Sequence, residues 1–153
     1  MFESLAAMLS NLIAHVQANP MLLLLIVYIF MRVKASAGPF PESGPRVHSL
    51  KNQKDFEDQV AGEKCGLCIV DFYATWCPPC KAAVSPYTQL SEKHTSVSFF
   101  KVNVDEVRDV AQHENISSMP TFKIYKKGIC VGTVNGCKVN EIENFLNKAA
   151  KNE

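Results

Sequence analysis

Two cysteines three residues apart carry the most distinctive chemistry of this sequence. Cys77 and Cys80 belong to the Trp-Cys-Pro-Pro-Cys motif 76–80, which directly follows the apolar run 68–73. The run predicts a buried strand and the motif predicts the start of a helix, so we expect Cys77 to lie exposed at a helix N-terminus. Free backbone N–H groups and the helix dipole favour a thiolate there. Thiols at this spacing can also close a disulfide, so the pattern predicts a redox-active pair.

A carboxylate inside the predicted buried strand is the second chemical feature. Asp71 interrupts an otherwise apolar or aromatic run, 69–73. Burying an unpaired charge is energetically costly, so a charged residue at this position is expected to have a functional role. Burial raises the pKa of a carboxyl, which would let Asp71 exchange a proton with Cys80. The alternative is a structural carboxylate that is hydrogen-bonded to the backbone.

A second Cys-x-x-Cys pair, Cys65 and Cys68, precedes the first. Together the two pairs suggest a four-cysteine zinc site, but only eight residues separate them, against the usual spacing of about 15–20. A predicted buried strand also fills the interval. We therefore expect no metal ion and no other cofactor, with Cys68 as a small buried apolar residue and Cys65 in the loop before the strand.

Two single cysteines, Cys130 and Cys137, fall in the predicted hairpin and the last loop. We expect ordinary packing or exposure for both. Regulatory oxidation or intermolecular pairing is the alternative.

The remaining periodicity predicts an alternation of strands and helices. Expected strands are 47–50, 68–73, 97–104, 121–126 and 129–135, and expected helices are 52–60, 78–93, 109–114 and 138–150. The last two strands form a hairpin about Lys127-Gly128, and Pro86 should kink the helix that contains it. This order predicts an α/β fold with a mixed central sheet covered by helices on both sides.

The N-terminal region differs in composition from the rest. Residues 21–31 form an unbroken apolar run followed by Arg32 and Lys34. The run is too short to span a bilayer, which takes roughly 20 apolar residues. Leucine, isoleucine and valine recur at helical spacing over residues 4–17, which predicts an amphipathic helix, and Asn19-Pro20 marks a break. The two segments together predict a membrane anchor over residues 1–37. The first would lie at the membrane interface, and the second would cross the membrane obliquely.

A cleaved signal peptide is the rival interpretation, favoured by the small residues 35–37 and opposed by the missing basic segment before the apolar run. A buried hairpin or core helix is the structural alternative. As an anchor, the segment predicts a single-pass membrane protein whose Arg32 and Lys34 stay cytoplasmic, with the following domain facing the cytosol. The signal-peptide interpretation instead places the domain in the lumen of the secretory pathway. Residues 38–46, rich in proline and glycine, predict a linker, and 47–153 the folded domain.

Bulk composition excludes some functions. The chain has 153 residues with a formal net charge of +1, and it has no basic run. Nucleic-acid binding therefore gets no support. Six cysteines are too few for a disulfide scaffold in a chain of this length.

The motif and the order of elements resemble the thioredoxin family over residues 47–150. Four landmarks carry the likeness: segment 71–77 (Asp-Phe-Tyr-Ala-Thr-Trp-Cys), segment 118–122 (Ser-Met-Pro-Thr-Phe), Gly128 and Gly136. Met-Pro-Thr-Phe followed by Lys-Lys-Gly is similar to the eukaryotic thioredoxins in particular. The resemblance implies a thioredoxin fold, here preceded by an N-terminal hydrophobic helix.

One position departs from the family pattern. The usual pair is Cys-Gly-Pro-Cys, whereas Pro78 replaces the glycine in this chain. Cys-Pro-Pro-Cys in this setting resembles tryparedoxins and nucleoredoxins. Two prolines remove two backbone donors near the thiolate, so we expect a shifted reduction potential and a changed choice of reductase.

The resemblance also implies roles for the reacting residues. Cys77 would attack a substrate disulfide to give a mixed disulfide, and Cys80 would resolve it. Lys101, on the neighbouring strand by the family's topology, would be the partner of Asp71.

Five further residues are expected to contact substrate. Pro120 resembles the family's cis-proline, whose preceding residue, Met119, pairs with the substrate backbone. Trp76, Pro78 and Pro79 would border the disulfide, although simple packing is the alternative for Trp76.

These features predict a membrane-anchored protein-disulfide reductase. Its expected partners are protein disulfides, a dithiol or thioredoxin-reductase-like electron donor, and a membrane. The alternatives are a lumenal disulfide oxidase or isomerase and a non-catalytic thioredoxin-fold adaptor tethered to a membrane.

Overall fold

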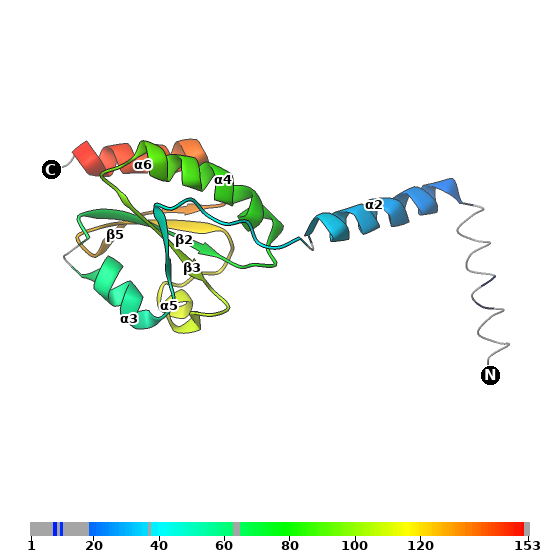
Figure 1. Ribbon diagram of the computed structural model, residues 1–153, viewed down its shortest axis with the longest axis horizontal. Coiled ribbons are helices and arrows are strands. Elements are labelled where there is room, and N and C mark those ends of the chain that lie inside the picture. The colour runs from blue at the N-terminus through cyan, green and yellow to red at the C-terminus, as the bar shows by residue number, and fades with distance from the viewer. Residues whose placement is uncertain (1–7, 9, 11–18, 37, 63–64, 152–153) are drawn as a thin grey trace. The chain divides into compact units, whose positions relative to one another are not determined.

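The computed structural model describes residues 8, 10, 19–36, 38–62 and 65–151 (Figure 1). The chain divides into two units, one ending at Gly38 and the other beginning at Pro39. The proposed amphipathic helix over 4–17 lies almost wholly outside the described residues.

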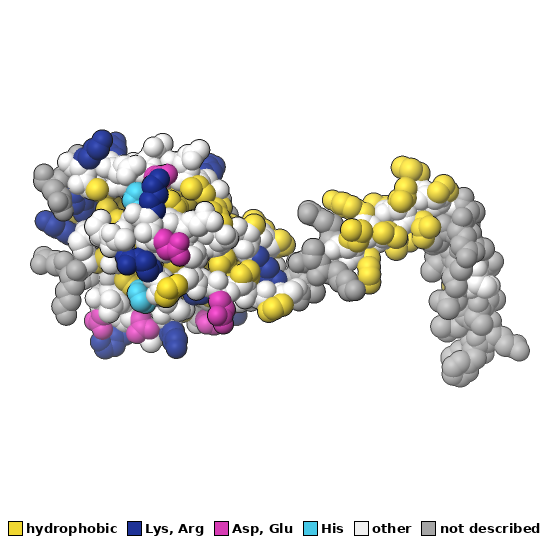
Figure 2. All heavy atoms as spheres, turned by 45° about the horizontal axis from the view of Figure 1, so that its top comes forward, with side chains coloured by type: hydrophobic (Ala, Val, Ile, Leu, Met, Phe, Trp, Pro, Cys, Tyr) yellow, Lys and Arg dark blue, Asp and Glu magenta, His cyan; other side chains and the backbone are white. Residues whose placement is uncertain are grey.

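Helix α2 (Pro20–Ser36) is the element described in the first unit. It begins with proline at its first position, where the missing N–H costs no intrahelical bond. Every side chain of residues 21–31 is exposed, between 39% and 78%, and Figure 2 shows the hydrophobic atoms of this helix in yellow. Among the residues that the structure describes, no helix is long and apolar enough to cross a membrane. With 17 residues, α2 is about 25 Å long, against roughly 30 Å of hydrocarbon in a bilayer.

The second unit is built on a five-stranded mixed sheet with strand order β1-β3-β2-β4-β5. The strands are β1 (Val47–Leu50), β2 (Leu67–Tyr73), β3 (Ser98–Asn103), β4 (Thr121–Lys126) and β5 (Ile129–Asn135). The pairs β1–β3 and β3–β2 are parallel, whereas β2–β4 and β4–β5 are antiparallel. The hairpin turns at Lys127 and Gly128, both at positive φ (50° and 78°) as a tight two-residue turn requires. The predicted mixed sheet is confirmed.

Helices cover both faces of the sheet (Figure 1). Helices α4 (Pro78–Lys93) and α6 (Val139–Lys151) lie on one face, and α3 (Gln53–Phe56) and α5 (Arg108–His113) lie on the other. The single helix expected over 52–60 is wrong in its second half, where a π-helical turn, Glu57–Ala61, follows α3. The Gly62 N–H donates to the Glu57 carbonyl (2.9 Å), which closes the wider turn.

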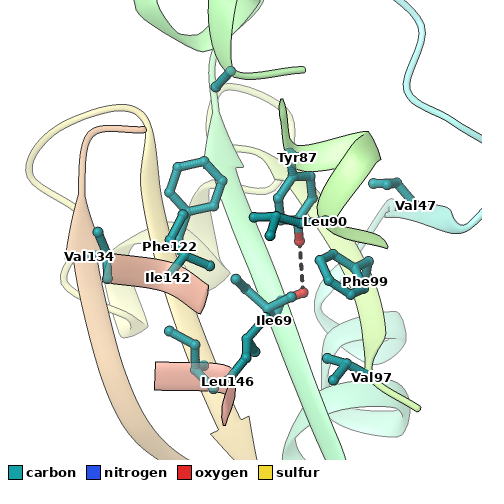
Figure 3. Packing of buried hydrophobic residues seen from close by; sticks show 12 residues of the cluster. Val47, Ile69, Tyr87, Leu90, Val97, Phe99, Phe122, Val134, Ile142 and Leu146 are labelled. Atoms are coloured by element: carbon teal, nitrogen blue, oxygen red, sulfur yellow. Dashed lines mark hydrogen bonds between the residues drawn. The ribbon is translucent and has the colours of Figure 1, made fainter. Parts of the chain in front are cut away.

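Side-chain alternation along β2 divides the core into two layers. Ile69 packs in the cluster beneath α4 and α6, whereas Cys68 and Val70 pack in the cluster on the α3 and α5 face. Tyr87 of α4 is fully buried in the first cluster, and its hydroxyl hydrogen-bonds with the Ile69 carbonyl at 3.0 Å (Figure 3). This contact joins the helix that carries the cysteine pair to the strand that leads into it.

Candidate active site

The cysteine pair opens helix α4 at the carboxyl end of β2. Cys77 is the N-cap residue, and Pro78 and Pro79 occupy the first two helical positions, where a backbone N–H would have no intrahelical partner. Cys77 and Cys80 form a disulfide with a Cα–Cα distance of 5.3 Å. The Cys80 N–H donates to Cys77 Sγ (3.3 Å), so a helix-terminal amide does point at this sulfur.

Both cysteines are more enclosed than the sequence indicated. Cys77 is 4% exposed and Cys80 is fully buried, in a small cluster with Tyr73 and Ala74. The expectation of an exposed Cys77 is therefore wrong for the disulfide form. Met119 packs against the same cluster and covers it from the facing loop. Cys77 is still the more accessible of the pair.

The loop before β4 faces the disulfide. The Met119–Pro120 peptide bond is cis, as the resemblance implied, and the Met119 carbonyl oxygen lies 3.7 Å from Cys77 Sγ. The Thr121 hydroxyl hydrogen-bonds with the Ser118 carbonyl at 2.8 Å. The Gly136 N–H donates to the Pro120 carbonyl, also at 2.8 Å. The last loop and β4 therefore hold the proline beside the sulfur.

Trp76 projects from the site and is 61% exposed. Its indole Nε1–H donates to Asp105 Oδ2 (2.8 Å), which lies in the loop after β3. Simple packing, the alternative for Trp76, accounts poorly for an exposed ring held by a side-chain hydrogen bond. Asp105 was not predicted, because nothing in its local sequence connects it to a tryptophan 29 positions away.

Asp71 lies on the α4 face of β2, since it shares that face with Ile69. Its side chain is buried (3% exposed), and in the described part of the chain Oδ1 has no hydrogen-bond partner. Oδ1 therefore does not fit the alternative of a structural carboxylate that is hydrogen-bonded to the backbone. Burial raises the pKa of Asp71 to about 7, and the opposing charge of Lys101 lowers it by less than burial raises it. A carboxyl with this pKa exchanges protons readily near neutral pH.

Lys101 is the register partner of Asp71 on β3, which confirms that the two residues are neighbours. Its ammonium group, however, donates to Ser43 Oγ (3.0 Å) and lies 5.8 Å from the centre of the Tyr73 ring. Lys101 thus acts on the carboxylate through its charge from the adjacent strand.

Residues 39–46, which belong to the predicted linker 38–46, contain no helix or strand but pack on the domain. The Phe40 ring lies 4.6 Å from the Tyr73 ring, between ring centroids, and borders the cluster around the disulfide. Further along, the Gly44 N–H donates to Thr88 Oγ1 (3.1 Å) on α4. Phe40 and Ser43 are site neighbours that sequence reasoning missed, because proline and glycine content predicts irregular backbone without saying what it contacts.

The remaining cysteines are not part of the disulfide. Cys65 and Cys68 are buried near the start of β2, Cys130 is exposed on β5, and Cys137 is half-buried in the last loop. Burial and the nearby Asp71 charge both raise the pKa of Cys137. The two Cys-x-x-Cys pairs lie at opposite ends of β2. Cys68 and Tyr73, the strand residues nearest the two pairs, are about 17 Å apart along the strand, which is too far for one tetrahedral zinc site.

Fold and site together define a class: an α/β protein whose exchangeable disulfide opens a helix at the end of a mixed sheet. A thioredoxin family model matches residues 47–148. Thioredoxin 1 of Plasmodium falciparum is 40% identical over 104 residues, which cover 68% of this chain and 98% of the relative. Human thioredoxin is 38% identical over 104 residues, which cover 67% of this chain and 97% of the human protein. The solved structure of the thioredoxin NaTrxh from Nicotiana alata aligns with a TM-score of 0.65 and 36% identity, covering 71% of this chain and 97% of that one.

The chain belongs to the thioredoxin family. It is a thiol–disulfide oxidoreductase that acts on protein disulfides.

Proposed function

We propose that the protein works as a reductase in which Cys77 attacks substrate disulfides and Cys80 resolves the intermediate. The observation that carries this proposal is the placement of the Cys77–Cys80 disulfide at the start of α4, with the carbonyl of the cis Met119–Pro120 peptide beside Cys77 Sγ. Cys77 is the more accessible sulfur and receives the Cys80 amide N–H, which stabilises negative charge on it.

The cycle transfers two electrons from the dithiol to the substrate. The Cys77 thiolate attacks one substrate sulfur, a Cys77–substrate disulfide forms, and the other substrate sulfur leaves as a thiolate. The Cys80 thiolate then attacks Cys77 Sγ, which closes the Cys77–Cys80 disulfide and releases the second substrate thiolate. A dithiol donor of the thioredoxin-reductase kind returns the pair to the reduced form.

Asp71 is proposed to take the Cys80 proton before the second step. It lies on the face of β2 that packs against α4, the helix that carries Cys80, and its Oδ1 has no partner among the described residues. Its pKa of about 7 suits a group that accepts and returns a proton at neutral pH. Lys101 is proposed to set that pKa from the neighbouring strand rather than to touch the substrate.

Substrate is proposed to lie across the loop that holds Met119 and Pro120. The Met119 backbone would pair with an extended substrate segment next to Cys77, and Trp76 would contact the substrate from the other side. Pro78 and Pro79 give the helix start a rigid surface without free N–H groups.

The test is reduction of insulin by the full chain with dithiothreitol as electron source. Wild type should turn over and Cys77→Ser should be inactive. Cys80→Ser, reduced beforehand, freed of dithiothreitol and then mixed with insulin, should accumulate a mixed disulfide that survives alkylation. Full turnover by Cys77→Ser, or none by wild type, would contradict the catalytic proposal and favour the adaptor. A measured potential near −270 mV supports a reductase, and one between about −180 and −120 mV would instead favour an oxidase or isomerase.

We further propose that α2 attaches the protein to a membrane, with the thioredoxin domain on the cytosolic side. A helix that is apolar all round, with its side chains 21–31 exposed, is typical of a segment that meets lipid. Because α2 is shorter than a bilayer core, the proposal requires it to enter only part of the bilayer or to thin the bilayer locally.

Flotation of the full chain with neutral phosphatidylcholine vesicles tests the attachment. Wild type should float, and a Leu25→Asp/Ile26→Asp double variant should remain in the soluble fraction. Val131→Asp, at an exposed apolar residue of β5, is the matched control and should float like wild type. Equal flotation of all three would exclude α2 as the attachment. In cells, protection of the domain from protease in sealed membranes would place it in the lumen instead. A glycan on Asn115, which begins the sequon Asn-Ile-Ser at 115–117, would do the same.

A further inference from the structure

Residues 39–46, which we call the strap, precede the residues 47–148 that match the thioredoxin family model. The strap contains no helix or strand, and it is the cyan segment beside α4 in Figure 1. Several of its residues nevertheless make defined contacts with the domain, namely Phe40, Ser43, Gly44 and Arg46. An irregular segment that is fixed at several points does more than link two parts of a chain.

The strap is fixed along α4. The Gly44 N–H donates to Thr88 Oγ1 (3.1 Å). The Arg46 guanidinium donates to the Ser91 carbonyl (2.8 Å) and to the Thr95 carbonyl (2.9 Å). Gly44 approaches the helix so closely that a Cβ atom at this position would lie 2.4 Å from Thr88 Cγ2. A larger residue at position 44 must therefore displace the strap or turn the Thr88 side chain, and either change breaks the hydrogen bond between them.

Two strap residues contact the two neighbours of Asp71 on the sheet. The Phe40 ring lies on the Tyr73 ring, 4.6 Å between centroids, and Tyr73 shares its face of β2 with Asp71. Ser43 accepts a hydrogen bond from Lys101, the register partner of Asp71 on β3. The Lys101 ammonium also lies 5.8 Å from the centre of the Tyr73 ring. The strap thus contacts both residues that flank the buried carboxyl.

Phe40 also borders the reacting sulfurs. It packs against the small buried cluster that contains Cys77 and Cys80. Phe40 is half-buried, whereas Cys80 is fully buried and Asp71 is 3% exposed. Its ring is therefore part of the wall between solvent and the region of the core that holds Asp71 and Cys80.

We propose that the strap shields Asp71 and Cys80 from solvent. Gly44 seats the strap on α4 and Phe40 covers the Tyr73 ring, so both are positioning residues. The inference deepens the proposed function, on which it rests, because the shielded step is the transfer of the Cys80 proton to Asp71. Water that reached Asp71 would hydrate the carboxylate and make it a weaker base. The closed strap thus keeps the carboxyl able to accept the Cys80 proton at neutral pH.

Alkylation of Cys80 by iodoacetamide measures its access to solvent. In the full chain carrying Cys77→Ser, Cys80 is a free thiol, and mass spectrometry of the Cys80 peptide gives the rate. The limiting rate at alkaline pH, where the thiol is wholly ionised, reports access, whereas the midpoint of the pH profile reports the pKa of the thiol. Adding Phe40→Ala should raise the limiting rate about 2–10-fold, which is the change in a local opening equilibrium expected from the loss of one aromatic pair.

Phe145→Ala in the same background is the matched control. Phe145 is also half-buried, but it packs against the cluster beneath α4 and α6. Its loss should leave the limiting rate of Cys80 unchanged, and Phe40→Leu, which keeps an apolar cover, should fall between the parent and Phe40→Ala. An equal rise in Phe40→Ala and Phe145→Ala, or no rise in Phe40→Ala, would overturn the shield.

Substitutions at the contact with α4 displace the strap without changing any residue of the disulfide cluster. Gly44→Ala should raise the limiting rate as Phe40→Ala does, because the new Cβ meets Thr88 Cγ2. Gly44→Ala/Thr88→Ser removes that methyl group, keeps the hydroxyl that accepts the N–H, and should restore the parent rate. A parent rate in Gly44→Ala, or a double variant as fast as Gly44→Ala, would overturn the seating role of Gly44.

The pKa of Asp71 in the disulfide form, from an NMR titration of its carboxyl carbon, is the second readout. The ionisable groups around Asp71 in this form are Lys101 on β3, Tyr73 on β2, Tyr87 on α4 and Cys137 in the last loop. Phe40→Ala changes none of them and should lower the pKa of Asp71, because water reaches the carboxyl. An unchanged or raised pKa would overturn the shield. Neither readout depends on substrate turnover, so failure of the reductase proposal would leave both results unchanged.

Discussion

The Lys101 ammonium donates to Ser43 Oγ at 3.0 Å, although the strand register places Lys101 beside Asp71. Ser43 belongs to the irregular segment that precedes β1, so a residue outside the sheet and helices holds the ammonium group on a partner other than the buried carboxyl. Lys101 lowers the pKa of Asp71 against the larger effect of burial. The position of the ammonium therefore affects the proton affinity of Asp71.

Ser43→Ala should lower the pKa of Asp71, by less than about one unit, because it releases Lys101 to approach the carboxylate. Lys101→Met should raise that pKa, since it removes a positive charge that lowers it. The measurement is an NMR titration of the Asp71 carboxyl carbon in the disulfide form, in which Cys77 and Cys80 do not titrate. Shifts of the same sign in the two variants would contradict the positioning role of Ser43. Ser85→Ala, on α4, is the matched control.

Asp71→Asn should stabilise the protein at alkaline pH. The pKa of Asp71 is raised from 3.8 to about 7, so the folded protein binds the carboxyl proton more tightly than the unfolded chain does. The free energy of unfolding therefore falls as the pH rises from about 4 to about 7. Above that range the loss of stability from ionising Asp71 is complete. At about 1.4 kcal/mol per unit the cost reaches about 4 kcal/mol.

Urea unfolding of wild type and Asp71→Asn between pH 3.5 and 8.5, roughly the window of this shift, measures the effect. The advantage of the variant should be greatest at pH 8 and should vanish near pH 4, whereas the exposed Asp109→Asn should show no such trend. A difference that does not vary with pH would exclude Asp71 as the cause. The same variant should slow insulin reduction at the resolving step, so the gain in stability accompanies a loss of activity.

Pro78→Gly should raise the reduction potential of the Cys77–Cys80 couple. The substitution restores a backbone N–H at the first position of α4, where it can stabilise the Cys77 thiolate and hence the reduced form. One such hydrogen bond, about 0.5–1.5 kcal/mol, corresponds to roughly 10–30 mV for a two-electron couple. Equilibration with glutathione redox buffers measures the change, and a lower potential would show that backbone stiffness dominates. Pro86→Ala, inside α4 and away from the disulfide, is the control.

The elements of the sheet could be predicted closely because each has a local cause. The strand Val47–Leu50, the helix Pro78–Lys93 and the hairpin strands begin and end at the predicted residues. Alternation of apolar residues, proline at a helix start and glycine in a tight turn act within a few positions. The π-helical turn at Glu57–Ala61 could not be predicted, since the same apolar spacing suits an ordinary α-helix.

The site could be predicted only in part. Asp71 was identifiable because a charge within a buried strand conflicts with its surroundings, and Lys101 followed from the family's topology. The enclosure of Cys77, by contrast, depends on Met119 from a distant loop. The contacts of Phe40 and Ser43 likewise depend on tertiary packing of an irregular segment. No local pattern encodes such contacts, because they arise only when the sheet brings its loops together.

Asp105→Ala should weaken activity on proteins while sparing small disulfides. Asp105 accepts the Trp76 indole N–H (2.8 Å) and so fixes an exposed ring beside the disulfide. Without this bond the ring regains rotamer freedom, which a protein substrate must remove on binding at a cost of about 0.5–1.5 kcal/mol. At roughly 1.4 kcal/mol per tenfold change, that cost corresponds to about a 2–10-fold loss in kcat/KM for insulin. Reduction of 5,5′-dithiobis(2-nitrobenzoate), which is too small to need the ring, should stay within about twofold of wild type by the same reasoning. Asp105→Asn keeps an acceptor and should retain most of the activity, whereas equal losses on both substrates would mean that Asp105 acts on the cysteines rather than on Trp76.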